Sequence, residues 1–415
     1  MAAAPPAKPE PVTPGAGLAP ATADHAAALA AAEARIAADA DAPGPRLQAA
    51  ARCVYLHRYA EAAAHARRAL ERVPESLIAH DALAHALFEL GEREGAAAHG
   101  CAALERRAQS VAGLTPAPLA LPSAPPPFDA RRPERHAIAF SLFGAASRYC
   151  ETAILNAYEA KRVYPGWHTR FYVDDSVPAQ VLRRLHRARA RVIRVPHAQR
   201  VLPGTMWRFL ACDDATLDRV LLRDADSLVG AREARAVDEW LAGPCWFHAM
   251  RDHGAHTELL LAGLWGVARA ALPPLTADMH AFVSAPHDRH FADQHFLRQF
   301  VWPHARRSLL QHDSVFGFLG ARAFPPGAPP APHVGAYESH WTLNHACDAV
   351  DGELVWWVYS KSGREFARYA SAVRAGHSIA HVPTRLRDAI ANGRVQVRVE
   401  PGAPQAGARP EGSSR

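Results

Sequence analysis

The chain has 415 residues, which is enough for two or three domains and at least one large hydrophobic core. Lysine and arginine exceed aspartate and glutamate by 47 to 41, and this net charge of +6 favours anionic partners such as nucleotides or phosphorylated lipids. The sequence has no basic-aromatic motif for nucleic acid, no membrane-spanning run, no signal-peptide h-region and no CxxC spacing among its six cysteines. We therefore expect a cytoplasmic protein without a zinc module or a disulfide framework.

The N-terminal part of the chain is expected to be helical after a disordered Ala/Pro-rich tail at residues 1–21. Within residues 22–110, the segment YAEAAAHARRALERVP from Tyr59 realigns thirty-four residues later with REGAAAHGCAALERRA from Arg93. The period and the spacing of small residues resemble tetratricopeptide repeats, in which antiparallel helices approach closely. A generic alanine-rich helical bundle is the alternative.

A proline-rich linker at residues 111–134 precedes a region in which strand-like and helix-like segments alternate. Strands are expected at 136–144, 170–176, 191–195, 219–226, 245–250 and 307–313, and helices at 146–163, 178–190, 232–241 and 292–300. This alternation predicts an α/β fold with a largely parallel sheet, whose chemistry lies at the carboxyl ends of the strands. Residues 341–400 form a C-terminal extension to which the pattern assigns no role, and 401–415 are expected to be disordered.

Two aspartates separated by one alanine close the apolar run in VLLRDADSLVG. Asp224 and Asp226 can both face one point above the sheet, and because like charges repel, we expect a counter-charge between them. Two hard oxygen ligands suit Mg²⁺ or Mn²⁺, which keeps waters and shares the oxygens of a substrate diphosphate. The alternatives are that Asp226 caps the next helix and that Asp224 pairs with Arg223 or another arginine.

An ordered set of motifs runs from His136 to about Gly335. They are YPGW, RFYVDDSVP, WRFL, RDADSLVGAREARAVDEWL, FHAMRDHGAH, AGLWG and DQHFL. This set resembles a little-characterised bacterial group of glycosyltransferases with the A-type nucleotide-sugar fold, whose hallmark is a DxD at the end of a central strand. The resemblance implies a Rossmann-like domain at residues 135–340 that moves a sugar from a nucleoside-diphosphate sugar to a glycan, lipid-linked or protein acceptor.

The resemblance also implies roles for individual residues. Asp224 and Asp226 would hold the Mn²⁺ or Mg²⁺ ion, with His312 as the first choice for a third ligand and His333 as the second. Asp252 and Asp293 are candidates for the base of an inverting enzyme; in a retaining enzyme they would only position the sugar. The expected substrate-binding residues are Gly144, Tyr149, Asp174, Arg208, Arg223, His253, Gly263, Trp265, Gln294 and His333.

Specific observations support the assignment of several of these residues to substrate binding. Gly144 lies in the first strand-to-helix connection, where close backbone approach and helix amides favour an anion. Asp174 resembles the acid that contacts the base or ribose, and Arg208 and Arg223 could balance the diphosphate or pair with the aspartates. The AGLWG motif would form the floor of the sugar pocket or a buried strand.

Two other classes of protein are weighed against the transferase. A haloacid-dehalogenase-like phosphatase also uses a DxD, but on the first strand of its domain, whereas three strands are expected before this one. A helical-repeat adaptor fused to an inactive α/β domain is the second, since repeat arrays bind protein partners. The presence of Asp224, Asp226 and Asp293 together argues against an inactive domain. The basic charge further suggests peripheral contact with the inner face of a membrane.

Overall fold

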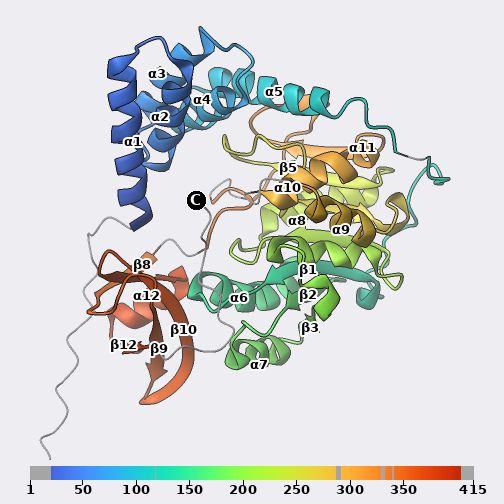
Figure 1. The fold of residues 1–415 in the computed structure, drawn as a ribbon. Coiled ribbons are helices and arrows are strands. Elements are labelled where there is room, and N and C mark those ends of the chain that lie inside the picture. Colours follow the sequence, from blue (N-terminus) through green and yellow to red (C-terminus); the bar gives the residue numbers. More distant parts are fainter. Residues whose placement is uncertain (1–19, 117, 287–290, 329–331, 339–340, 403–415) are drawn as a thin grey trace, which may run out of the picture.

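The computed structural model describes residues 20–116, 118–286, 291–328, 332–338 and 341–402 (Figure 1). Most of the two predicted disordered tails lies outside these residues. The described chain forms an N-terminal array of helices, a central α/β region and a C-terminal antiparallel sheet. None of its described helices combines the length and apolarity needed to cross a bilayer.

The N-terminal array consists of consecutive helices that each contact the next. They are α1 (Pro20–Ala38), α2 (Pro43–Tyr55), α3 (Tyr59–Leu70), α4 (Leu77–Glu89) and α5 (Arg93–Ser110). The two segments that align in the sequence begin at the first residues of α3 and α5. Buried alanines such as Ala62, Ala66 and Ala96 allow these helices to approach closely.

A seven-stranded sheet forms the centre of the molecule, in the order β3-β2-β1-β4-β6-β5-β7. The strands are β1 (His136–Leu142), β2 (His168–Val173), β3 (Arg191–Arg194), β4 (Arg219–Arg223), β5 (Phe247–Arg251), β6 (Trp265–Ala268) and β7 (Leu309–Asp313). All pairs are parallel except those of β6 with its two neighbours. Every residue of β1 and β4 is buried, as expected for strands covered on both faces. The predicted α/β class is confirmed.

Helices connect and cover these strands. They are α6 (Ser147–Val163), α7 (Ala179–Arg187), α8 (Ala231–Ala242), α9 (Thr276–Ser284), α10 (Ala292–Phe296) and α11 (Trp302–Ala305). The continuous helix predicted at 292–300 is wrong in detail, because α10 is followed by a π-helical turn at Leu297–Val301 before α11 begins. A 3₁₀ segment, Gly204–Asp213, precedes β4.

The strand order reverses direction between β1 and β4. From β1 the chain moves outward through β2 to β3, and then returns to place β4 on the other side of β1. In an open α/β sheet, such a reversal leaves a crevice outside the carboxyl ends of the two strands, where ligands bind. The segments that leave β1 and β4 at this point carry Gly144 and Asp224.

The C-terminal extension folds into a second sheet, in the order β12-β9-β10-β11-β8, with antiparallel pairs. Its elements are β8 (Trp341–Ala346), β9 (Leu354–Lys361), β10 (Arg364–Arg374), β11 (His377–Val382), α12 (Thr384–Ala391) and β12 (Gln396–Pro401). The sheet packs beside α6 and α7, where Gln180 Nε2 donates to the carbonyl of Arg368 at 2.8 Å. The Ala370 amide donates to the carbonyl of Ala145 at 3.1 Å, so this sheet also contacts the loop after β1.

Candidate functional site

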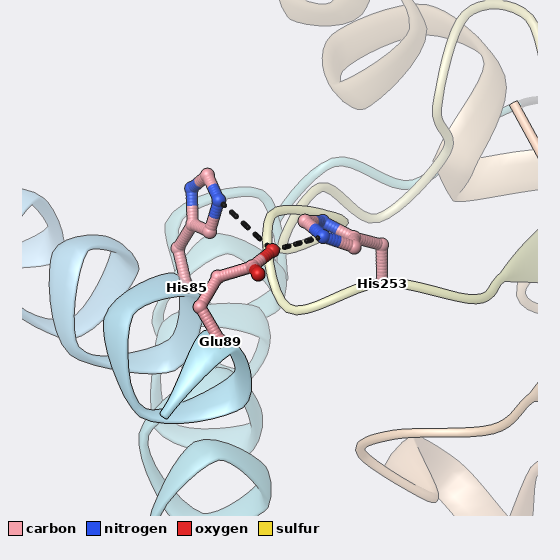
Figure 2. Close-up of side chains that lie close together, drawn as sticks. All are labelled: His85, Glu89 and His253. Atoms are coloured by element: carbon pink, nitrogen blue, oxygen red, sulfur yellow. Dashed lines mark hydrogen bonds and ion pairs between the residues drawn. The ribbon is translucent and has the colours of Figure 1, made fainter. Parts of the chain in front are cut away.

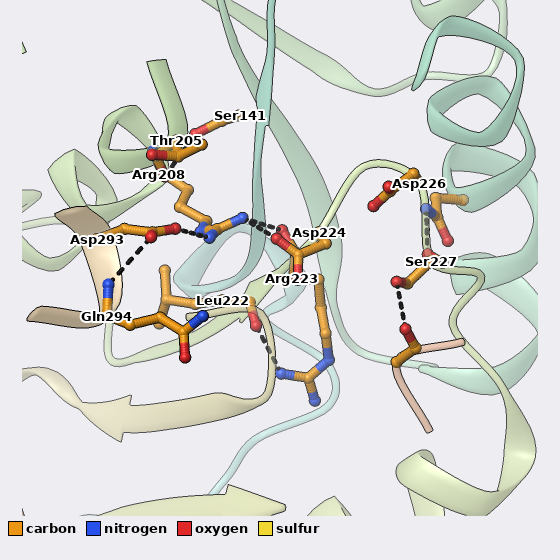
Figure 3. A network of polar contacts seen from close by, with 12 residues as sticks. Ser141, Thr205, Arg208, Leu222, Arg223, Asp224, Asp226, Ser227, Asp293 and Gln294 are labelled. Atoms are coloured by element: carbon orange, nitrogen blue, oxygen red, sulfur yellow. Dashed lines mark hydrogen bonds and ion pairs between the residues drawn. The ribbon is translucent and has the colours of Figure 1, made fainter. Parts of the chain in front are cut away.

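An ion-pair chain occupies the carboxyl end of β4 (Figure 3). Arg208, from the 3₁₀ segment, lies between two carboxylates: its guanidinium pairs with Asp224 and, at 2.8 Å, with Asp293 at the start of α10. Arg208 is 3 % exposed, whereas the Asp224 side chain is 43 % exposed and therefore open to a ligand. The structure thus brings together three residues predicted from separate motifs.

Asp226 has its own arginine. Arg148, in the first turn of α6, donates from Nε and from its terminal nitrogen to Asp226 Oδ2 at 3.0 and 2.6 Å. The Arg148 guanidinium also lies 3.9 Å from the ring centroid of Tyr337, which is half-exposed. Each aspartate of the pair is therefore neutralised by a separate arginine, which is the counter-charge that the sequence requires.

Burial raises the pKa values of two of these carboxyls. For Asp226, desolvation raises the pKa, Arg148 opposes the rise, and the neighbouring Asp224 adds to it. For Asp293, desolvation again raises the pKa against the effect of Arg208, with a further contribution from Asp224. The influence of Asp224 on both groups shows that the three carboxyls share one electrostatic environment.

Gly263 leaves the space that the Asp224 carboxylate fills. A Cβ atom built at Gly263 would overlap Oδ2 and Cγ of Asp224 and would lie 3.0 Å from the Asp224 amide nitrogen. Gln294 follows Asp293 on α10, and its backbone N–H donates to Asp293 Oδ1 at 3.0 Å (Figure 3). Glycine at position 263 is therefore a steric requirement for the position of Asp224.

The loops after β1 and β2 are joined by a short polar relay. The Gly144 amide donates to Ser176 Oγ at 2.6 Å, and the Ser176 hydroxyl and amide both donate to Asp174 Oδ1. Gly144 has φ +76°, a left-handed conformation that favours glycine. Asp174 thereby fixes the loop in which Gly144 lies. Tyr149, next to Arg148, is partly exposed at the start of α6.

Two predicted substrate contacts are corrected by the structure. Arg223 points away from the acid pair: it is 2 % exposed, and its Nε donates to Glu233 Oε1 at 3.0 Å on α8. It also donates to the carbonyl of Trp265 at 3.1 Å. Trp265 is completely buried on β6, with its ring at the edge of Phe209, so it belongs to the core and not to the floor of a sugar pocket.

The prediction that His312 completes the metal site is also corrected. His312 lies on β7, three strands from β4 and hence about 14 Å away at ordinary strand spacing. Its ring is buried, with Nδ1 2.9 Å from His248 Nε2 and Nε2 3.0 Å from Glu239. Both nitrogens therefore have protein partners away from the acid pair.

Asp252 is fully engaged by structural partners, which argues against its predicted role as a base. Its two oxygens accept from Arg232 at 2.8 Å each, from Ser314 at 2.5 Å and from the Val334 amide at 3.0 Å. His253 turns instead to Glu89 on α4, and His333 stacks on His253 with ring centroids 4.4 Å apart. The acid pair and these histidines thus form two separate polar groups.

Sequence reasoning missed Arg148 and Tyr337. Arg148 could have been found from the sequence, because it is the first basic residue of the helix that follows the Gly144 loop. That helix begins where the strand order reverses, which is where ligands bind in open α/β sheets. Tyr337 had no sequence signal. It reaches the site because residues 335–338 run beside the acid pair: Ser227 Oγ donates to the carbonyl of Gly335, and the Glu338 amide donates to the carbonyl of Asp226.

The carboxylate oxygens at the end of β4 supply some, but not all, of the ligands that a hard divalent cation needs. Asp224 and Asp226 offer carboxylate oxygens, and Mg²⁺ is usually bound by one or two carboxylates together with waters and substrate phosphates. Among the described residues, no third histidine, cysteine or carboxylate lies close enough to both to complete a protein cage. Any ion held by this pair would therefore take its remaining ligands from water or from a bound molecule.

Comparison with known proteins does not assign the chain to a family. No protein-family model matches the chain, and no curated protein matches it. Solved structures that resemble it include an O-GlcNAc transferase mutant of Thermobaculum terrenum, at 16 % identity and TM-score 0.27, over 49 % of this chain and 43 % of that one. The chain thus spans less than half the length of that transferase.

Two further matches are glycosyltransferases. One is the M. tuberculosis glucosyl-3-phosphoglycerate synthase in complex with Mn²⁺, UDP-glucose and phosphoglyceric acid, at 15 % identity and TM-score 0.29, over 48 % of this chain and 74 % of that one. The other acts in the glycosylation of the PBCV-1 major capsid, at 14 % identity and TM-score 0.29, over 43 % and 80 %. At these scores, the likeness is too low to assign a family or an activity.

Proposed function

We propose that the chain is a metal-dependent glycosyltransferase that moves a sugar from a nucleoside-diphosphate sugar to a glycan, lipid-linked or protein acceptor. One observation carries the proposal: Asp224 and Asp226 leave the carboxyl end of β4 at the reversal of strand order beside β1. Open α/β sheets bind ligands at that place, and the Asp224 side chain is exposed there.

Arg148 and Arg208 supply the positive charge for a donor diphosphate. In the free protein they neutralise Asp226 and Asp224, and arginine binds carboxylate and phosphate oxygens with the same planar fork. Mn²⁺ or Mg²⁺ at the acid pair would neutralise charge on the departing diphosphate. The two arginines would then exchange carboxylate partners for phosphate oxygens, so that donor binding replaces one set of ion pairs with another.

With Asp252 held by structural partners, Asp293 is the carboxylate proposed to face the acceptor hydroxyl. It is buried, its pKa is raised by desolvation, and Arg208 ties it to Asp224. A raised pKa favours proton uptake from an acceptor hydroxyl if the reaction inverts the anomeric centre. In a retaining enzyme, the same residue would orient the sugar. Gln294, beside Asp293, and Gly263, beside Asp224, would complete the substrate site.

The experiment is a thermal-stability panel of UDP, GDP and other nucleoside diphosphates, with and without Mn²⁺. We expect one nucleotide to raise the Tm only when the metal is present, because binding to the native state alone shifts the unfolding equilibrium. Asp226→Asn should remove the shift, whereas Asp175→Asn, which changes an exposed ion-paired aspartate after β2, should keep it. The absence of any metal-dependent shift would favour the adaptor instead.

The acceptor and the cellular position belong to the same proposal. The net charge of +6 is compatible with a phosphorylated lipid acceptor at the inner face of a membrane, and the N-terminal helices offer a surface for a protein partner. Co-flotation with anionic vesicles at low salt, reversed by high salt, is the expected result for peripheral contact. A chain that does not float at low salt has no such contact.

A further inference from the structure

Two histidines and a glutamate from distant parts of the sequence meet between the N-terminal helices and the central region (Figure 2). His85 and Glu89 lie one turn apart on α4, and His253 lies in the loop after β5. His253 Nε2 is 2.8 Å from Glu89 Oε1, and His85 Nε2 is 3.8 Å from the same oxygen. One ligand atom from each residue lies within 4.8 Å of the other two.

The surrounding contact holds these side chains in place. A Cβ atom at Gly254 would overlap Phe88 and lie 2.7 Å from the carbonyl oxygen of Ala84, so the loop is already in close contact with α4. The His253 side chain is only 14 % exposed, and its ring lies at the edge of Phe88 with centroids 4.7 Å apart. Glu89 is 31 % exposed and leaves the group open to solvent.

We propose that His85, Glu89 and His253 form a binding site for a divalent transition-metal ion of the zinc type. Two imidazoles and a carboxylate are an established ligand set for Zn²⁺, and imidazole also suits Co²⁺ and Ni²⁺. Zinc bonds of about 2.0–2.1 Å at tetrahedral angles separate neighbouring ligand atoms by about 3.4 Å. The two measured separations lie on either side of that value, so small rotations of the side chains would admit the ion.

Metal binding requires one change of proton position. His253 Nδ1 accepts from the Ala255 amide at 3.1 Å, and its Nε2 therefore carries the proton that it donates to Glu89. When the ion binds Nε2, the proton moves to Nδ1 and the Ala255 hydrogen bond is given up. Glu89 exchanges a hydrogen bond for a metal bond, and no net proton is lost from the imidazole.

His333 is a candidate for a fourth ligand. Its ring stacks on His253, and its Nδ1 lies 3.0 Å from the carbonyl of Val334, an arrangement that leaves Nε2 with the lone pair. The segment that begins at His333 continues to Tyr337 and Glu338 beside the acid pair. An ion at this site would therefore join the N-terminal helices to the loop after β5 and, through His333, to the segment that passes the acid pair.

The test uses the full chain without a polyhistidine tag, stripped with EDTA and titrated with Zn²⁺ by calorimetry. We expect one equivalent whose affinity falls at least tenfold in His85→Gln, Glu89→Gln and His253→Gln, since even outer-shell changes cost about 10–100-fold. His280→Gln, a matched change at a histidine bonded to Gln199, should leave the affinity unchanged. Bound Co²⁺ should show the visible spectrum of a tetrahedral N/O site.

Two variants distinguish metal binding at this site from metal binding at the acid pair and from loss of folding. Asp226→Asn should retain the zinc equivalent, so that failure of the nucleotide proposal leaves the zinc proposal intact. Glu89→Gln keeps the size and a hydrogen bond to His253, so its unfolding curve in EDTA should match that of the parent chain. Zinc affinity and stoichiometry that are equal in the parent and all three ligand variants would overturn the proposal.

Discussion

At the scale of single residues, position relative to the backbone decides which of two similar side chains serves the site. Arg208 and Arg223 both flank the acid pair in sequence or space, yet only Arg208 reaches Asp224, while Arg223 is buried against Glu233. Arg223 ends β4, and because adjacent residues of a strand point to opposite faces, its side chain leaves on the other side from Asp224; Arg208 reaches Asp224 from the 3₁₀ segment. Asp224, one residue beyond β4, emerges at the edge where a ligand can approach.

Gly263→Ala should inactivate the proposed transferase while leaving the chain folded. The added methyl group occupies the volume of the Asp224 carboxylate, and displacement of a catalytic group by about 1 Å can cost about 10²-fold in rate. The measurement is turnover of the nucleotide sugar identified by the stability panel, together with the unfolding midpoint. Gly230→Ala is the control, because a Cβ atom there meets nothing within 4 Å and φ is negative. Equal activities in the two variants would contradict the steric argument.

At the scale of elements, a few buried polar groups join helices to sheets. Glu151 on α6 is 1 % exposed and accepts from Arg184 on α7 at 2.8 Å and from the Tyr369 hydroxyl on β10. One carboxylate therefore holds two helices and the C-terminal sheet together. Such a group is costly to break from one side, because its partners remain buried without a counter-charge.

Glu151→Gln should lower the free energy of unfolding by about 3 kcal/mol, at the lower end of the cost of breaking a buried ion pair. Urea unfolding followed by circular dichroism measures this change. The matched variant is Glu159→Gln on the same helix, whose ion pair with Arg162 is exposed and should contribute far less to stability. An equal loss in both variants would show that Glu151 does not join these elements.

Acid should destabilise the start of β2 through His168. Burial lowers the His168 pKa to about 4, and the ring donates from Nδ1 to the carbonyl of Pro133 while Nε2 accepts from Arg170. The unfolded chain therefore binds the proton first, so stability falls as pH drops from about 6.5 to about 4, by at most about 3 kcal/mol. His168→Gln should flatten this part of the curve of unfolding free energy against pH. An unchanged slope would contradict the assignment.

At the scale of the whole molecule, the three regions meet around one edge of the central sheet. The N-terminal helices pack on the loop after β5, where Arg107 on α5 lies 3.3 Å from Glu258. The C-terminal sheet contacts the loop after β1. The C-terminal sheet therefore lies beside the loop that carries Gly144, whereas the acids and arginines of the proposed donor site come from the central region.

Gly254→Val should loosen the N-terminal helices from the central region. Its side chain would meet the backbone carbonyl of Ala84, which cannot move without shifting α4. We expect faster limited proteolysis in the linker at residues 111–134, with a lower unfolding midpoint. Gly44→Val is the control, because Gly44 lies on α2 outside this segment and a Cβ atom there meets nothing within 4 Å. Equal cleavage rates for the two variants and the parent would show that this contact does not hold the helices.

Local sequence patterns are sufficient to predict the alternation of strands and helices, the α/β class and the position of Asp224 and Asp226 at a strand end. These features follow from local periodicity, because a buried parallel strand must be a short apolar run that stops where polar residues begin. The same local information predicted the helical N-terminal region, whose alanines have high helix propensity and pack closely.

Which distant residues lie together depends on the folded arrangement of the chain. This arrangement paired Arg148 with Asp226, placed Arg208 between Asp224 and Asp293, buried Trp265 and Arg223, and moved His312 to the far edge strand. It also formed a second sheet from residues 341–401 and brought His85 to His253. Periodicity reports which face of an element is apolar, but strand order and the packing of regions fix which polar faces meet, and these depend on contacts between residues far apart in the chain.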